Sequence, residues 1–131
     1  MEKLIICLFA LLLVTGCGNK DQKVAEQSEN GSNTVQAITC AKMKQMLDEE
    51  KDVVLIDVRS KEEYETQHLS KAINIPNERI KTITENEDIT KDTKIIVYCR
   101  SGARSKNSAN ELINMGYKNV YDLGAMSNCS K

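Results

Sequence analysis

Residues 95–105 read Ile-Ile-Val-Tyr-Cys-Arg-Ser-Gly-Ala-Arg-Ser, and this stretch determines the fold class. Its first four residues are a continuous apolar run, as expected of a strand that is buried on both faces of a parallel sheet. Its last residues begin a helix predicted over 104–115, with Ala109 and Leu112 facing inward and Gly116 as the C-cap. A polar loop therefore joins a buried strand to a helix, and ligands collect at such junctions in parallel sheets.

The same alternation of strands and helices continues on both sides of this stretch. Short apolar runs predict further strands at 35–38, 53–56, 72–75 and 120–123. Helices are predicted to follow Thr39, Ser60 and Pro76, because these residue types favour helix starts. Strands that alternate with helices pair in parallel, so the sequence predicts an α/β fold whose parallel sheet is covered on both faces.

Cys99 directly follows the most apolar strand, where backbone N–H groups and a helix N-terminus converge. Both features stabilise a thiolate over a thiol. Arg100 and Arg104 add positive charge, and Gly102 permits the backbone conformation of a tight cradle. The same arrangement would bind an anionic group. The loop therefore predicts a thiolate nucleophile that attacks an oxyanion-bearing substrate.

Two classes of substrate fit that chemistry. A sulfur donor such as thiosulfate would leave a persulfide on the cysteine, and a phosphate ester would leave a phosphocysteine. Four residues lie between Cys99 and Arg104, whereas the similar loop of cysteine-dependent phosphatases is one residue longer. A related phosphatase or arsenate reductase stays an alternative, as does a non-catalytic sulfur-carrier or binding module.

Residues 99–105 resemble the Cys-Arg-x-Gly-x-Arg-Ser loop of the rhodanese family. The resemblance covers roughly 35–123, and its other motifs are Asp57-Val58-Arg59 and His68-Leu69 followed by residues 72–76. It implies a rhodanese-like three-layer fold, with a five-stranded, mainly parallel sheet between helices. It also implies a sulfurtransferase that moves sulfur from thiosulfate or a related donor to a thiol or cyanide through a Cys99 persulfide. No cofactor or metal ion is expected.

The resemblance also assigns the site residues. Substrate binding is expected at the rest of the loop, namely Arg100, Ser101, Gly102, Ala103, Arg104 and Ser105. Asp57 and Arg59 are expected to pair as structural support. His68 is expected to be structural, because a thiolate held by N–H groups needs no general base. Glu62 and Glu63 are expected on the solvated face of a short helix.

Residues 1–16 are predicted to be a lipoprotein signal peptide. Lys3 precedes an apolar run over 4–14, which is shorter than the roughly 20 residues that span a bilayer and suits a signal peptide. The following residues resemble a bacterial lipobox in which the Cys17 thiol receives a lipid. Residues 17–34 contain almost nothing apolar and are expected to be a flexible tether, with the domain over 35–131. The protein is thus expected to be extracytoplasmic and membrane-anchored.

Charge and the remaining cysteines complete the predictions. The formal net charge is −1, with acidic and basic residues interspersed, which gives no case for nucleic acid binding. Apart from the membrane, the expected partner is a small sulfur-containing anion or a protein persulfide. Because the first and last strands are neighbours in the rhodanese fold, Cys40 and Cys129 are expected to approach each other and form a disulfide outside the cell. Two alternatives stay open. In one, Cys129 acts as a resolving thiol for Cys99, and in the other, Cys40 and Cys129 are both free thiols.

Overall fold

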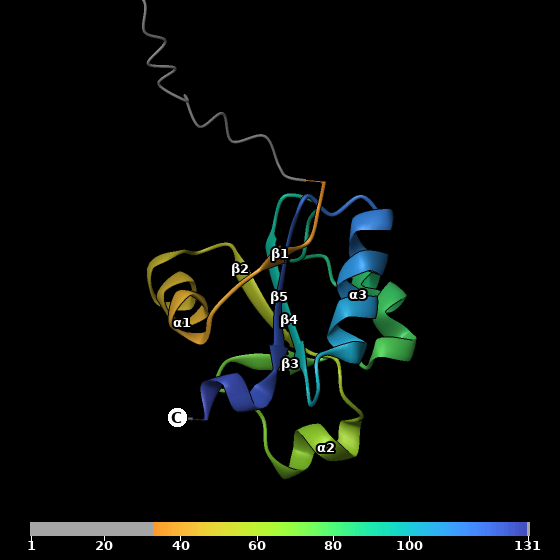
Figure 1. The fold of residues 1–131 in the computed structure, drawn as a ribbon. Coiled ribbons are helices and arrows are strands. Elements are labelled where there is room, and N and C mark those ends of the chain that lie inside the picture. The colour runs from red at the N-terminus through yellow and green to blue at the C-terminus, as the bar shows by residue number, and fades with distance from the viewer. Residues whose placement is uncertain (1–32, 131) are drawn as a thin grey trace, which may run out of the picture.

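The computed structural model describes residues 33–130, so the predicted signal peptide, Cys17 and nearly all of the predicted tether lie outside the described residues. The described chain forms one sheet with helices on both faces (Figure 1). Its strands are β1 (Gln36–Ala37), β2 (Val53–Asp57), β3 (Ala72–Asn74), β4 (Lys94–Cys99) and β5 (Asn119–Ala125). Their order is β1-β5-β4-β2-β3, and every neighbouring pair is parallel. The predicted five-stranded, three-layer α/β fold is confirmed.

The helices begin where local sequence signals place them. The N-cap Thr39 accepts a hydrogen bond from the Lys42 N–H at 3.2 Å and starts α1 (Cys40–Glu49). Ser60 and Glu63 cap each other's backbone N–H groups and start α2 (Lys61–Thr66). The remaining elements are the helix α3 (Ala103–Asn114) and the 3-10 helices η1 (Asn77–Glu85) and η2 (Met126–Cys129). The segment after Pro76 is therefore helical as predicted, but in the tighter 3-10 form.

Two apolar clusters fill the spaces on either side of the sheet. In Figure 1, α1 covers one face, and α3 with η1 covers the other. Because successive strand residues point to opposite faces, β4 contributes Val97 and Cys99 to the cluster under α3 and η1. It contributes Ile96 and Tyr98 to the cluster under α1. Cys99 and its neighbour Tyr98 thus belong to different layers of the molecule.

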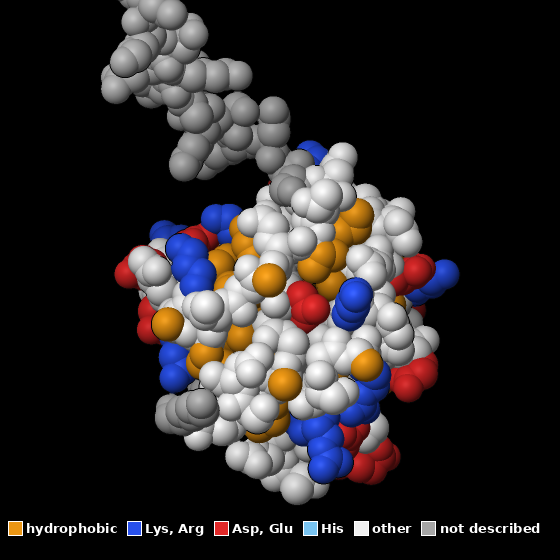
Figure 2. All heavy atoms as spheres, viewed as in Figure 1, with side chains coloured by type: hydrophobic (Ala, Val, Ile, Leu, Met, Phe, Trp, Pro, Cys, Tyr) orange, Lys and Arg blue, Asp and Glu red, His pale blue; other side chains and the backbone are white. Residues whose placement is uncertain are grey.

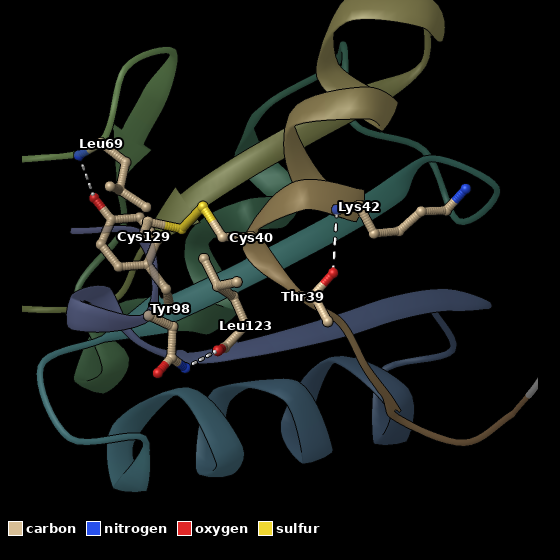
Figure 3. Close-up of a disulfide and its surroundings, with 8 residues drawn as sticks. Thr39, Cys40, Lys42, Leu69, Tyr98, Leu123 and Cys129 are labelled. Carbon is tan, nitrogen blue, oxygen red and sulfur yellow. Dashed lines mark hydrogen bonds between the residues drawn. A yellow bond between two sulfur atoms is a disulfide. The ribbon is translucent and has the colours of Figure 1, made fainter. Parts of the chain in front are cut away.

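Cys40 and Cys129 are joined by a disulfide, with their Cα atoms 5.3 Å apart (Figure 3). Cys40 is the first residue of α1 and Cys129 the last of η2, and both pack against the cluster under α1. Cys99 is the free cysteine of the described residues and lies in the opposite cluster. The structure therefore has the predicted bridge and not the alternative pairing of Cys129 with Cys99.

No helix within residues 33–130 is long and apolar enough to span a membrane. The longest helix of the described residues, α3, has 12 residues.

Loss of the disulfide is expected to destabilise the domain. The bridge closes a loop between residues 89 positions apart, and in the chain-entropy model such a loop stabilises by about 4–5 kcal/mol. Cys129→Ser should therefore lower the free energy of unfolding in urea by up to that amount. Peptide mapping without reductant should recover a Cys40–Cys129 peptide. A Cys99–Cys129 peptide, or equal stability of the variant and the parent chain, would contradict the assignment.

Candidate active site

Cys99 ends β4, and its side chain is completely buried. The N–H of Gly102 donates a hydrogen bond to the Cys99 sulfur at 2.9 Å. Gly102 has a φ of +96°, a left-handed conformation that glycine adopts without strain, and it is the N-cap of α3. The positive end of the α3 dipole therefore lies beside the sulfur.

The pKa of the Cys99 thiol is lowered from its ordinary value by the surrounding loop. Burial by itself raises this pKa, but hydrogen bonds from the N–H and hydroxyl of Ser105, and from the N–H groups of Gly102 and Ser101, outweigh it. Ser105 is completely buried, and its hydroxyl donates to the Gly102 carbonyl at 3.1 Å, so it turns from that carbonyl when it donates to the thiolate. Neutral donors of the loop thus stabilise the thiolate.

Arg104 is paired with Glu63, so its charge is not free to bind a substrate anion. Its guanidinium donates two hydrogen bonds to that carboxylate, at 2.7 and 3.0 Å. The hydrogen bond from Arg104 is the main cause that lowers the pKa of Glu63 to about 2. The Arg104 charge still interacts with Cys99, so Arg104 joins the α2 N-terminus to the cysteine loop.

The prediction of a solvated face is wrong for Glu63 and holds for Glu62, which is exposed. The sequence showed the capping box but not the pair with Arg104, which is 41 positions away. One signal for this pair was present in the sequence, because β2 and β4 were both predicted as buried parallel strands. The helices that follow neighbouring parallel strands begin at the same edge of the sheet.

Asp57 and Arg59 pair as predicted, in a network that supports a connecting loop. Arg59 donates to the Asp57 carboxylate through Nε at 3.0 Å and Nη2 at 2.7 Å, and Nη2 also donates to the Gln67 carbonyl at 2.6 Å. The buried Tyr98 hydroxyl donates to Asp57 at 2.8 Å. It also accepts a hydrogen bond from the Leu69 N–H at 3.0 Å, which Figure 3 shows. Tyr98 was foreseen only as a strand residue. This network fixes residues 67–69 beside the site.

His68 has a structural place. Its ring stacks on Tyr64, with ring centroids 3.9 Å apart, and Nδ1 lies 2.8 Å from the Tyr64 carbonyl oxygen. Its side chain is exposed, and none of its contacts reaches Cys99.

A pocket of about 510 Å³ lies beside the cysteine loop. It is lined by the side chains of Arg59, Glu63, Thr66, Gln67, Arg100, Met126, Ser127 and Ser130. The exposed residues Arg100, Ser101 and Ala103 lie on the outer side of the loop, and Arg100 is the only one of them that lines this pocket. Over the face seen in Figure 2, acidic and basic side chains are interspersed rather than gathered by sign. Across residues 33–130, no three His, Cys, Asp or Glu side chains lie close enough to hold a metal ion.

The sequence profile of the rhodanese-like domain matches residues 39–128. The chain belongs to the rhodanese-like domain family. The match includes every strand of the described sheet except β1, together with the Cys99 loop, Asp57 and Cys40, and it ends one residue before Cys129. The family assignment therefore rests on the same residues that build the site.

Curated relatives include sulfurtransferases. Thiosulfate sulfurtransferase GlpE of Coxiella burnetii is 33% identical over 73 residues, which are 56% of this chain and 66% of that protein. The adenylyltransferase and sulfurtransferase uba4 of Ogataea parapolymorpha is 33% identical over 116 residues, 88% of this chain and 27% of that protein. The rhodanese-like chain thus spans between about a quarter and two thirds of the length of these relatives.

A solved structure supports the assignment. A rhodanese with anions from E. coli is 34% identical, with a TM-score of 0.54, over 58% of this chain and 89% of that chain. The likeness thus extends over most of a solved rhodanese, in both sequence and fold.

Ser105→Ala should raise the pKa of Cys99, because it removes the hydroxyl that stabilises the thiolate. The measurement is the rate of Cys99 alkylation against pH. In the parent chain the midpoint should lie below about 8.5, the value of a free cysteine, and in the variant it should move toward that value.

Ser108→Ala is the matched control for this variant. Ser108 is also a completely buried serine of α3, but its hydroxyl donates to Asn77 at 2.7 Å. Its loss should leave the alkylation midpoint in place. If the parent chain and both variants share one alkylation midpoint, the Ser105 hydroxyl does not lower the pKa of Cys99. A parent midpoint at or above the free-cysteine value would show that the loop as a whole does not stabilise the thiolate.

Proposed function

We propose that this domain is a sulfurtransferase in which Cys99 carries sulfur as a persulfide. The observation that carries the proposal is the hydrogen bond from the Gly102 N–H to the Cys99 sulfur, at 2.9 Å, within a loop at the carboxyl end of β4. Sulfurtransferases among the relatives, and a rhodanese among the solved structures, support it. Thiosulfate, or a related anion with a sulfane sulfur, is the proposed donor.

The first half-reaction forms the persulfide. The Cys99 thiolate attacks the outer sulfur of thiosulfate, a sulfur–sulfur bond forms to Cys99, and the donor's own sulfur–sulfur bond breaks. Sulfite leaves with the electron pair of the broken bond. The N–H groups of Gly102, Ser101 and Ser105 are preorganised around the attacking sulfur, so they stabilise negative charge there without rearranging.

The second half-reaction returns the cysteine. A thiolate or cyanide attacks the terminal sulfur of the persulfide, and the bond between the two sulfur atoms breaks. The electron pair stays on Cys99 as a thiolate, and the product is an acceptor persulfide or thiocyanate. Because the same low-pKa thiolate is the leaving group here, the loop favours both directions of transfer.

A binding or sulfur-carrier module is a second candidate, and one observation favours it. The Cys99 side chain has no solvent exposure, so a donor reaches it only when neighbouring groups move. The phosphatase and arsenate reductase alternatives are less well supported, since the loop is one residue shorter than theirs. Turnover separates the enzyme from the carrier, because a carrier accepts sulfur but does not cycle.

Replacement of the cysteine tests the proposal directly. The full chain treated with thiosulfate should gain the mass of one sulfur atom on the peptide that holds Cys99, and should then form thiocyanate from cyanide repeatedly. Cys99→Ser should abolish both. A single mass gain without repeated turnover would favour the carrier, and full turnover by Cys99→Ser would refute the assignment of Cys99.

We also propose that the domain is exported and anchored through a lipid on Cys17. The sequence of residues 1–17 supports this, and so does the Cys40–Cys129 disulfide, because disulfides persist in oxidising compartments. One lipidated N-terminus would attach the domain to a membrane without a spanning helix.

Cys17→Ser should release the chain from the membrane fraction or leave its signal peptide uncleaved, because the lipid-accepting thiol is gone. Membrane fractionation and the mass of the N-terminal peptide measure both results. Cys7→Ser is the control, since Cys7 lies within the predicted signal peptide and its loss should change neither. Normal cleavage and anchoring of Cys17→Ser would show that the lipobox interpretation is mistaken.

A further inference from the structure

The turn η2 forms one wall of the active-site pocket, which is the cavity of about 510 Å³ beside the cysteine loop that Arg100 lines and Cys99 does not. Met126 and Ser127 of this turn, with Ser130 directly after it, line the pocket together with residues of α2. Figure 1 shows η2 and α2 at the same end of the sheet. The turn starts beside the nucleophile, because Ala125 is the register partner of Cys99 in the sheet.

Within residues 33–130, the disulfide is the one bond that joins this turn to another helix. The other bonds of the turn are local: the Asn128 side chain donates to the Leu123 carbonyl at 3.0 Å, and the Ser130 N–H donates to the Ser127 carbonyl at 3.1 Å. Gly124, with a φ of +77°, and Ala125 are still paired with β4, so the turn can change its direction only after Ala125. Without the Cys129–Cys40 bond, these local hydrogen bonds and the packing of Met126 on the cluster under α1 are what restrain the turn.

The disulfide is open to solvent on a side away from the active-site pocket. Both of its cysteines are partly exposed. Cys129 lines a second, smaller groove of about 180 Å³ with Met43, Leu47 and Leu69, and none of the residues around this groove lines the active-site pocket. A reductant can therefore reach the disulfide without entering the site of sulfur transfer.

We propose that the Cys40–Cys129 disulfide is a redox latch that sets which sulfur donors and acceptors reach Cys99. With the latch closed, the η2 wall is fixed and Cys99 stays buried, so small anions and small thiols are favoured. A dithiol opens the latch: its two thiols become a disulfide, and Cys40 and Cys129 become two thiols. The turn then moves away from the end of β5 at Ala125, and the widened pocket admits peptide or protein thiols. The inference rests on the proposed function for its chemistry, but access to Cys99 is measurable without it.

The test compares labelling of Cys99 by a small and a bulky thiol reagent. The full chain, oxidised or reduced with dithiothreitol and then desalted, reacts with iodoacetamide or with a polyethylene glycol maleimide. Peptide mass spectrometry follows Cys99 separately from the other cysteines. Reduction, or the double variant Cys40→Ser with Cys129→Ser, should raise the bulky-reagent rate several-fold and change the iodoacetamide rate little.

Ile89→Ala controls for a general loss of stability. Ile89 is buried near the opposite end of β4 from Cys99, and its truncation destabilises the core while leaving the disulfide intact. Equal bulky-reagent rates in the oxidised and latch-free chains would overturn the proposal. So would an equal increase in Ile89→Ala, or loss of the native near-ultraviolet circular dichroism on reduction, since the disulfide would then hold the whole fold. Failure of sulfur transfer alone would leave the labelling result readable and would refute only the proposed function.

Discussion

Parallel pairing of β4 between β2 and β5 is the constraint on which the site depends. The register places Asp57 opposite Tyr98, and Cys99 opposite Ala125. Because all of these strands run in one direction, their carboxyl ends reach the same edge of the sheet. The segments that follow them, α2, α3 and η2, therefore start around one point. Glu63, Arg104 and the pocket wall at Met126 come together there although they are far apart in the sequence.

Strand alternation then divides the chemistry between two layers. Cys99 faces the cluster under α3, where the helix N-terminus and loop N–H groups stabilise a thiolate. Tyr98, one residue earlier, faces the cluster under α1 together with both cysteines of the disulfide. The sheet therefore lies between the reactive thiol and the bridge. A direct exchange between them would require one of the two sulfur atoms to cross to the other face, and this explains how an oxidised bridge and a free nucleophile coexist in one small domain.

Local signals made much of this fold predictable from the sequence, and long-range contacts account for what was not. The Ser60–Glu63 capping box and the apolar run before Cys99 act within a few residues, so their pattern is visible in the sequence. The pair of Glu63 with Arg104 depends on how two helix starts meet across the sheet, which no local pattern encodes. Tyr98 illustrates the same limit, since its place in a strand was evident from the sequence. Its hydroxyl supports the connecting loop only because Asp57 lies on the neighbouring strand and the Leu69 N–H on the loop. The complete burial of Cys99 likewise depends on tertiary packing.

The groups around the Cys99 sulfur divide two tasks in the proposed reaction. One group attracts the anion, and others stabilise the thiolate that reacts with it. Of the two arginines that line the pocket, Arg59 is paired with Asp57, whereas Arg100 makes no ion pair within residues 33–130. Arg100 is exposed, so its attraction for an anion is screened by salt. Of the N–H groups that hold the Cys99 sulfur, that of Ser105 belongs to a buried residue and that of Gly102 to a partly buried one, so salt screens them less. In the proposed sulfur transfer, binding of an anionic donor should therefore weaken as salt rises, while the thiolate itself stays stabilised, because separate groups perform the two tasks.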